Sequence, residues 1–222
     1  MTMARVRRSF RRRPIVRRYK RRYIRRYRRR VARPLKSGCM VCKIRRIDTE
    51  THTLSKIGIH SLWRSPADFT EFNKLYLGFE TYQVLRCNIR IVPCANVSGP
   101  EASSLPLYVV APWHQDVPTK TEFNSYLTID KARIYRGTQV SNRNFVPCIK
   151  LSGADTSPAT TYASLQWKPK IACTSVGASG IVHYTGLLVM QELSGAAAGA
   201  TSKFNIIQTW TVKFEGQNTM SV

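Results

Sequence analysis

The first 36 residues contain no aspartate or glutamate, although the chain has 12 acidic residues in all. They hold 18 of its 36 lysines and arginines, so three quarters of the formal net charge of +24 lies in about a sixth of the sequence. Like charges at this density cannot collapse into a core, so we expect residues 1–36 to form a disordered, extended arm in the free protein. Residues 37–222 have a more balanced composition and the length of one globular domain.

Long apolar runs are also absent. No stretch of about 18 apolar residues predicts a membrane-spanning helix. The N-terminus passes straight into arginine, without the apolar segment and cleavage site of a secretion signal. Basic amphipathic segments can lie on anionic lipid, but the arm's apolar positions are mostly tyrosine, which disfavours insertion. We therefore expect no membrane insertion and no secretion.

The sequence lacks the motifs of catalysis. It has no Gly-x-Ser-x-Gly, no phosphate-binding glycine-rich loop and no His-Glu-x-x-His, and its four histidines are isolated. Asp48 and Glu50 are a close acidic pair that would share one face of a strand, but no third ligand for a metal ion lies near them. We therefore expect a protein that is not an enzyme, with no cofactor and no metal site.

Six cysteines are spread through residues 37–222, and only Cys39 and Cys42 are closely spaced. A zinc site would need a second compact pair of ligands, and the nearest histidine, His52, stands ten residues beyond Cys42. A redox motif would need a βαβ context, which is also missing. The pattern favours reduced, structural cysteines.

A four-residue repeat fills the centre of the arm: Arg17–Lys20, Arg21–Ile24, Arg25–Arg28 and Arg29–Ala32 follow without a break. Sixteen of the 18 basic residues of the arm are arginine, whose guanidinium forks onto phosphate oxygens. Neutralising phosphate releases counterions, so binding would be strong, salt-dependent and mostly indifferent to sequence. The predicted DNA-binding residues are Arg5, Arg7, Arg8, Arg11, Arg12, Arg13, Arg17, Arg18, Tyr19, Lys20, Arg21, Arg22, Tyr23, Arg25, Arg26, Tyr27, Arg28, Arg29, Arg30, Arg33 and Lys36.

Aromatic residues interleave the arginines. Tyr19, Tyr23 and Tyr27 offer flat faces for unpaired bases, at roughly 1–3 kcal/mol per base, which favours a single-stranded ligand. The same tyrosines recur every four residues between Pro14 and Pro34, as in one stripe of a helix. Because the arginines repel one another, we expect such a helix only when the arm is bound.

The basic runs also predict a nuclear-import signal read by importin-type receptors. Its predicted residues are Arg5, Arg7, Arg8, Arg11, Arg12, Arg13, Arg17, Arg18, Lys20, Arg21, Arg22, Arg25, Arg26, Arg28, Arg29 and Arg30.

After Pro34 the composition changes to alternating apolar and polar residues bounded by Gly, Pro, Ser and Asn, which is typical of strands. In Tyr82–Val92 the alternation places Leu85, Cys87, Ile89 and Ile91 on one face. In the last strand Phe204, Ile206, Trp210, Val212 and Phe214 share one parity. The run 181–192 is almost continuously apolar and predicts a central strand, whereas Pro169 breaks an edge strand at 165–173. The connection 112–131 is too polar for a core element, and without a long amphipathic helix the domain should be all-β, a sandwich or roll.

These features, in this order, resemble the capsid proteins of circoviruses and cycloviruses. The arginine-rich arm with aromatics leads into a β domain of similar length. The segment Phe79-Glu80-Thr81-Tyr82-Gln83-Val84-Leu85-Arg86-Cys87-Asn88-Ile89-Arg90-Ile91-Val92-Pro93-Cys94 is similar to the family's basic alternating strand with its closing Pro-Cys, and Phe204–Glu215 is similar to its final strand.

The resemblance implies a single eight-stranded antiparallel jelly roll, assembled as sixty copies in a small icosahedral shell around circular single-stranded DNA. It implies strands at 40–50, 57–63, 82–92, 107–111, 132–136, 144–151, 181–192 and 203–215, with loops 94–106, 138–143 and 193–202 near fivefold axes. It also implies location in the virion and the host nucleus, and attachment to sulfated glycans on host cells. The alternative is a cellular basic-tailed nucleic-acid-binding protein, ribosomal or chromatin-like. Sixty arms of +18 would neutralise about a thousand nucleotides, which suits a small genome.

Overall fold

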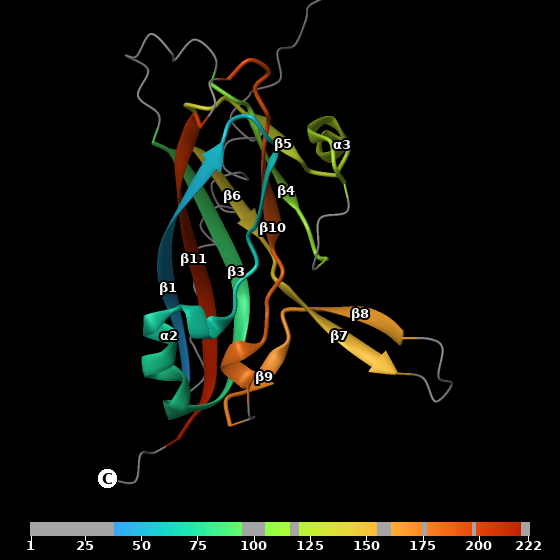
Figure 1. Cartoon of the computed structure of the whole chain (residues 1–222). Coiled ribbons are helices and arrows are strands. Elements are labelled where there is room, and N and C mark those ends of the chain that lie inside the picture. Colours follow the sequence, from blue (N-terminus) through green and yellow to red (C-terminus); the bar gives the residue numbers. More distant parts are fainter. Residues whose placement is uncertain are drawn as a thin grey trace, which may run out of the picture. The chain divides into compact units, whose positions relative to one another are not determined.

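The computed structural model describes residues 38–94, 105–115, 120–154, 161–174, 177–196 and 199–218 (Figure 1). These residues form antiparallel sheets with short helices between the strands. None of their helices has the length and apolarity that a bilayer crossing requires. The arm predicted at residues 1–36, with every predicted DNA-binding and nuclear-import residue, lies outside the described residues.

The last strand of the domain lies inside the first sheet, which we call sheet A. In order, sheet A contains β1 (Cys39–Thr53), β11 (Thr201–Gln217), β3 (Phe79–Pro93) and β6 (Ser141–Phe145), and β9 (Lys170–Ala172) also pairs with β3. Every residue of β1 has a partner in β11, from Cys39 opposite Glu215 to Thr53 opposite Thr201. Strand β11 therefore holds β1 and β3 together.

The second sheet, sheet B, contains β2 (Gly58–Ser61), β10 (Gly186–Met190), β4 (Tyr108–Pro112) and β5 (Arg133–Tyr135), in that order. All five residues of β10 are buried. The central strand predicted from the apolar run 181–192 is thus confirmed, although only its middle pairs as a strand. Gly186 is required there, because a Cβ atom would lie 2.6 Å from the backbone oxygen of Ala111.

One apolar core lies between the two sheets. It includes Ile89 and Trp210 of sheet A and Tyr108 and Leu188 of sheet B. In β11 every second residue from Ser202 to Phe214 is buried, so the alternation predicted for this strand is confirmed. Burying each large apolar side chain contributes about 1.5–3 kcal/mol to folding, which makes this face of β11 a main source of stability.

Strand β3 contains a register shift that the sequence did not reveal. Thr211 pairs with Arg86 while Val212 pairs with Val84, so Leu85 is an extra residue in the ladder. The shift changes which parity faces the core: Tyr82 and Val84 are buried before it and Cys87 after it. The prediction that Leu85 shares the core face is therefore wrong.

Short helices connect the strands. They are η1 (Pro66–Asp68), α2 (Thr70–Leu75) and η2 (Tyr76–Gly78) before β3, α3 (Phe123–Leu127) before β5, and η4 (Ala178–Gly180) before β10. Phe72 of α2 enters the core, where its ring meets Tyr82 edge-on at 4.9 Å. A helix of six residues has fewer than two turns, too few to show a helical period in the sequence.

Helix α3 covers the side of sheet B that faces away from the core. Its Tyr126 is fully buried and packs in a second apolar cluster with Val109, Leu187 and Val189. The hydroxyl of Tyr126 donates a hydrogen bond to the carbonyl of Lys120 at 2.5 Å. The prediction that the connection 112–131 holds no core element is therefore wrong: a few apolar residues within a polar segment cover this face.

The described residues contain eleven strands, three more than the eight predicted. Strands β7 (Cys148–Ala154) and β8 (Thr161–Trp167) pair with each other and project away from both sheets (Figure 1), and a single bridge joins Cys148 at the start of β7 to Tyr184. The strand predicted at 144–151 is divided into β6 and β7, because Pro147 has no N–H for a ladder. The predicted break at Pro169 is confirmed, since it falls between β8 and β9.

The other strand predictions overlap observed strands. β1, β2, β3, β4, β5 and β11 lie where strands were predicted at 40–50, 57–63, 82–92, 107–111, 132–136 and 203–215. The loop predicted at 138–143 is wrong in its second half, because β6 begins at Ser141. A strand start there follows from pairing with β3, a long-range contact that local composition does not encode.

Candidate nucleic-acid interface

The side chains of sheet A that point away from the core form a polar surface, which we call the outer face. Strand register aligns them in rows about 6.8 Å apart along the strands. The rows are Val41, Lys213, Gln83 and Lys170; Lys43, Thr211 and Arg86; Arg45, Thr209, Asn88 and Asn144; Ile47, Ile207, Arg90 and Asn142; Thr49, Asn205 and Val92; and Thr51 and Lys203.

The outer face carries cations and no carboxylate within these rows. Its exposed cations are Lys43, Arg45, Arg86, Arg90 and Lys203, with Lys170 and Lys213 at one end. Lys43, Arg45, Arg90 and Lys203 form no ion pair within the part of the chain that the structure describes. A surface of one sign attracts a polyanion and releases its counterions on contact.

The carboxylate of Glu215 lies one row beyond this surface. It accepts hydrogen bonds from the ammonium groups of Lys170, at 2.7 Å, and Lys213. These two bonds, Lys170 first, lower the pKa of Glu215 to about 2, and the bond to Glu215 raises the pKa of Lys213. Glu215 therefore stays ionised and is matched by its own lysines.

Amide side chains fix the centre of the outer face. Arg86 Nε donates to Asn144 Oδ1 at 2.8 Å, and Asn88 Nδ2 donates to the same oxygen at 3.0 Å and to Asn142 Oδ1 at 2.6 Å. Arg86 is thereby held across two strands of the sheet, with its charge at the surface. A cation positioned in this way loses less conformational entropy when it binds a phosphate.

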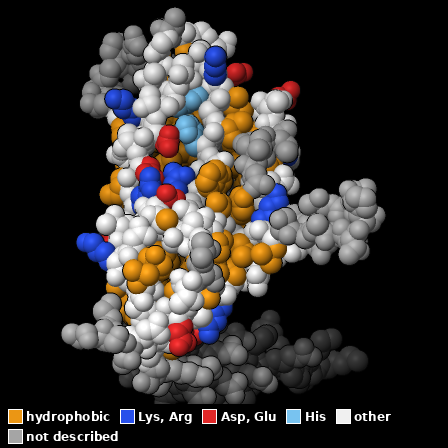
Figure 2. Space-filling model, turned by 60° about the horizontal axis from the view of Figure 1, so that its bottom comes forward, with side chains coloured by type: hydrophobic (Ala, Val, Ile, Leu, Met, Phe, Trp, Pro, Cys, Tyr) orange, Lys and Arg blue, Asp and Glu red, His pale blue; other side chains and the backbone are white. Residues whose placement is uncertain are grey.

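The other face of β1 carries charges of both signs, in contact with one another. Asp48 lies between two guanidinium groups, 2.8 Å from Arg46 and 3.2 Å from Arg64. Glu50 lies 3.5 Å from His60, whose pKa is lowered mainly by burial. Figure 2 shows basic and acidic side chains in contact on this side of the molecule, next to histidine.

Asp48 and Glu50 share one face of their strand, as the sequence predicts; Asp48 is engaged in ion pairs, and Glu50 lies against the ring of His60. Across the described ranges no group of three or more His, Cys, Asp or Glu could hold a metal ion. Cys39 and Cys42 stand three residues apart on β1, so their side chains point to opposite faces. Burial raises the pKa of Cys148 and Cys173 to about 11, which keeps these thiols protonated.

The cationic outer face was not predicted as a site. Its sequence signal is present only in part: Arg86, Asn88 and Arg90 alternate with apolar residues in β3. The contribution of Lys43 and Arg45 depends on β11 lying between β1 and β3, which no local pattern indicates. The predicted DNA-binding and nuclear-import residues of the arm stay predictions, because they lie outside the described residues.

An antiparallel β domain with one cationic sheet face is consistent with the class of protein found by comparison. Residues 5–218 match the family model described as circovirus capsid protein, and the chain belongs to this family. It is 39% identical over 178 residues to the capsid protein of Human associated cyclovirus 1 (isolate Homo sapiens/Pakistan/PK5510/2007), covering 78% of this chain and 80% of that protein.

Solved structures agree on the fold. The BFDV capsid protein in its 60-mer form superposes with a TM-score of 0.62 at 13% identity, covering 83% of this chain and 98% of that chain. Its decameric form gives a TM-score of 0.53 at 14% identity, covering 80% of this chain and 99% of the other. At these identities the likeness concerns the fold alone.

Proposed function

We propose that this capsid protein assembles as sixty copies into a small icosahedral shell that packages circular single-stranded DNA. The observation that carries the proposal is membership of the circovirus capsid protein family over residues 5–218. The similar fold of a protein solved as a 60-mer supports the sixty-subunit shell. Family membership also favours this function over a cellular basic-tailed protein, and a structural role over an enzymatic one.

The proposed domain at 37–222 is an eight-stranded jelly roll built from β1 to β6, β10 and β11. The sheet orders β1-β11-β3-β6 and β2-β10-β4-β5 support it, because in each sheet strands from distant parts of the chain alternate. Strands β7, β8 and β9 are additions between β6 and β10. The chain before this domain, residues 1–36, acts as the arm.

DNA contact is proposed at two places. The arginines of the arm neutralise phosphate and Tyr19, Tyr23 and Tyr27 stack on unpaired bases. The outer face of sheet A adds fixed cations such as Arg86 and Arg90 and would line the inside of the shell. The absence of carboxylates from its rows supports this orientation, because acidic groups there would repel the genome.

The arm also directs nuclear import through importin-type receptors, so the protein is found in the virion and the host nucleus. Its arginine clusters support this proposal, since import receptors bind basic runs. We further propose host-cell attachment through sulfated glycans, whose sulfate groups pair with the same cationic chemistry as phosphate.

Electron microscopy of the purified full-length chain tests the shell. We expect uniform closed particles that protect single-stranded DNA from nuclease. Scattered monomers or irregular aggregates in every assembly condition would contradict the proposal and favour the cellular alternative.

Deletion of residues 1–36 tests the division of roles. The truncated chain should keep the circular dichroism and unfolding transition of the full chain while it loses DNA packaging and nuclear accumulation. As a matched variant, replacing Tyr19, Tyr23 and Tyr27 with Ala preserves the charge, so single-strand binding should fall more than duplex binding. Unfolding of the truncated chain, or equal losses on both nucleic acids, would show that this division is wrong.

A further inference from the structure

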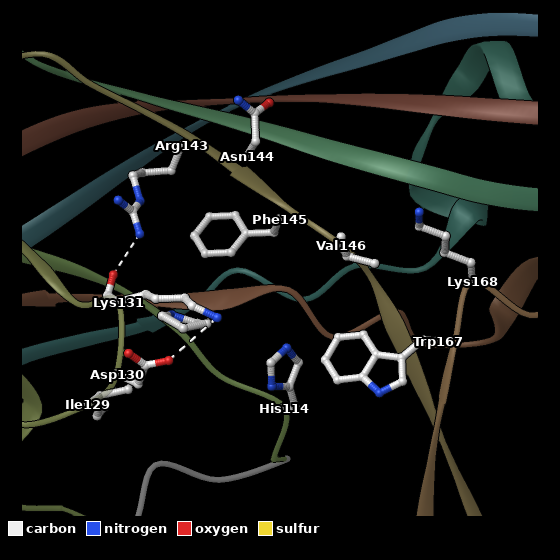
Figure 3. A pocket seen from close by; sticks show the side chains of 11 residues that line it. His114, Ile129, Asp130, Lys131, Arg143, Asn144, Phe145, Val146, Trp167 and Lys168 are labelled. Atoms are coloured by element: carbon white, nitrogen blue, oxygen red, sulfur yellow. Dashed lines mark hydrogen bonds and ion pairs between the residues drawn. The ribbon is translucent and has the colours of Figure 1, made fainter.

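A pocket of about 780 Å³ lies at the β6 edge of sheet A, at the base of the β7–β8 hairpin. Its walls come from four parts of the chain: Phe145 and Val146 at the end of β6, Trp167 and Lys168 at the end of β8, His114 after β4, and the segment 129–131 (Figure 3). The volume falls within the range of small-ligand sites, about 300–1,000 Å³.

Aromatic rings form one side of this pocket. Trp167 is 51% exposed although it is large and apolar, and its ring meets His114 edge-on at 4.8 Å. Phe145 lies between these rings and Arg143 in Figure 3. An exposed indole whose position is fixed by a neighbouring ring offers a flat face on which a nucleobase can stack.

Cations form the opposite rim. Arg143 donates a hydrogen bond to the carbonyl of Lys131 at 2.6 Å, and the Lys131 ammonium lies 3.5 Å from Asp130 (Figure 3). Lys168 lies on the other side, beside Trp167 (Figure 3), and the whole lining has three cations and one carboxylate. The rim therefore favours an anion.

The backbone is strained at this rim. Among the described residues other than glycine, only Lys131 and Lys168 have positive φ, at 62° and 49°. Both line the pocket. Left-handed conformations are uncommon for such residues and cluster at sites where the strain positions a functional group. Here the strained backbone places the two lysines on opposite sides of one cavity.

The pocket continues the outer face of sheet A. Asn144 belongs to both, because it lines the pocket and accepts the hydrogen bonds of Arg86 and Asn88. Gln83 of the outer face donates to the carbonyl of Lys168 at 2.6 Å. A strand of nucleic acid lying on the outer face would thus meet the pocket at the β6 edge.

We propose that this pocket binds one nucleotide of a single strand, with its base stacked on Trp167 and the phosphates on its two sides held by Lys168 and Lys131. The inference rests on the proposed DNA packaging and adds a specific site for an unpaired base to it. A segment of a second copy is disfavoured as the occupant, because the rim is cationic and each chain carries a net charge of +24.

Photocrosslinking tests the site in the full-length chain. The probe is a twelve-nucleotide oligothymidylate containing one 5-iodouracil, used at about 0.5 M salt, where the ionic contacts of the arm are screened. We expect a crosslinked peptide that contains Trp167. Trp167→Ala should weaken binding about tenfold and Trp167→Phe much less, because stacking needs only an aromatic face. The matched control is Trp63→Ala, an exposed tryptophan outside the pocket, which should bind like the unmodified chain.

The variant Lys168→Gly removes the charge of this lysine while it keeps the backbone conformation. Glycine adopts positive φ without strain, so the variant should unfold at the same temperature or higher while its oligonucleotide affinity falls about threefold. Crosslinks confined to the arm, or equal affinities for the Trp167→Ala and Trp63→Ala variants, would overturn the site. So would protection of Trp167 from hydroxyl radicals in empty particles, which would place a second copy in the pocket. If such variants still form particles that protect DNA, the proposed function stands without the pocket.

Discussion

Strand β1 carries charges on both of its faces, and the two faces differ in how those charges are satisfied. On the outer face Lys43 and Arg45 stand in solvent without an ion pair among the described residues. On the inner face Asp48 is shared by Arg46 and Arg64. Water solvates an isolated charge at low cost, whereas a half-buried charge requires a partner. The unpaired cations of the outer face therefore contribute little to the stability of the fold and are available to bind an anion.

The largest effect on the free energy of unfolding should come from low pH, which favours a charge on a buried histidine that has no anionic partner. His183 is fully buried beside Tyr82 and Trp210, its Nδ1 lies 2.9 Å from the carbonyl of Ile181, and Arg64 pairs with it through the backbone. Burial lowers the pKa of His183 to about 4. In the unfolded chain it is about 6.5, so the neutral ring stabilises the fold fully above that pH.

As the pH falls from about 6.5 to 4, the unfolded chain takes up this proton first and the stability is progressively lost. We expect a decrease of about 3 kcal/mol in the free energy of unfolding, measured by urea titration at each pH. His52 and His60, whose pKa values are also lowered, act in the same direction. A His183→Asn variant with the same pH dependence as the unmodified chain would assign the loss elsewhere.

Unpairing the inner charges should have the next largest effect. Asp48→Asn keeps the shape of the side chain but leaves Arg64 without its carboxylate and Arg46 with Asp68 alone, at 3.3 Å. We expect a loss of about 2 kcal/mol in the free energy of unfolding at pH 7. Lys43→Gln on the other face of the same strand is the control and should change it by less than about 0.5 kcal/mol. Equal losses would mean that the two faces do not differ.

The smallest effect on stability is expected from the outer face itself. Replacing Lys43, Arg45 and Arg90, which form no ion pair among the described residues, with Gln should change the free energy of unfolding by less than about 0.5 kcal/mol. The same variant should reduce the slope of log affinity against log salt by about 2 for single-stranded DNA, because each lost phosphate contact accounts for about 0.7.

A matched triple variant checks that this loss belongs to the outer face. Replacing Lys56, Lys74 and Arg133 with Gln removes three exposed cations from other parts of the domain. Its salt slope should equal that of the unmodified chain. If both triple variants lowered the slope alike, net charge and not the outer face would govern binding.

The alternation of residues predicted β11 well and β3 only in part. In β11 the core parity continues from Ser202 to Phe214, so the sequence pattern and the burial agree. In β3 the extra residue at Leu85 reverses the parity midway, and a bulge depends on the partner strand. Helices α2 and α3 are too short to show a helical period in the sequence, so their positions depend on packing against the sheets that they cover.

The candidate site, too, was predictable from the sequence only in part. The charge of the arm is evident from composition alone, since no folding is needed to count arginines. The outer face and the pocket arise from long-range neighbours: Asn144 meets Arg86 across 58 positions of sequence, and Trp167 meets His114 across the base of the hairpin. No local sequence pattern indicates that residues so far apart in the chain meet in the fold.

The placement of β11 between β1 and β3 also determines when the domain can fold during synthesis. Sheet A cannot close until residue 217 has left the ribosome, because its central strand is the last to be made. Pairing Cys39 with Glu215 closes a very long loop, and such non-local contacts form slowly, in milliseconds to seconds. The basic N-terminal segment therefore emerges well before the domain exists. A chain interrupted within β11 lacks the strand that joins β1 to β3, so it cannot complete sheet A.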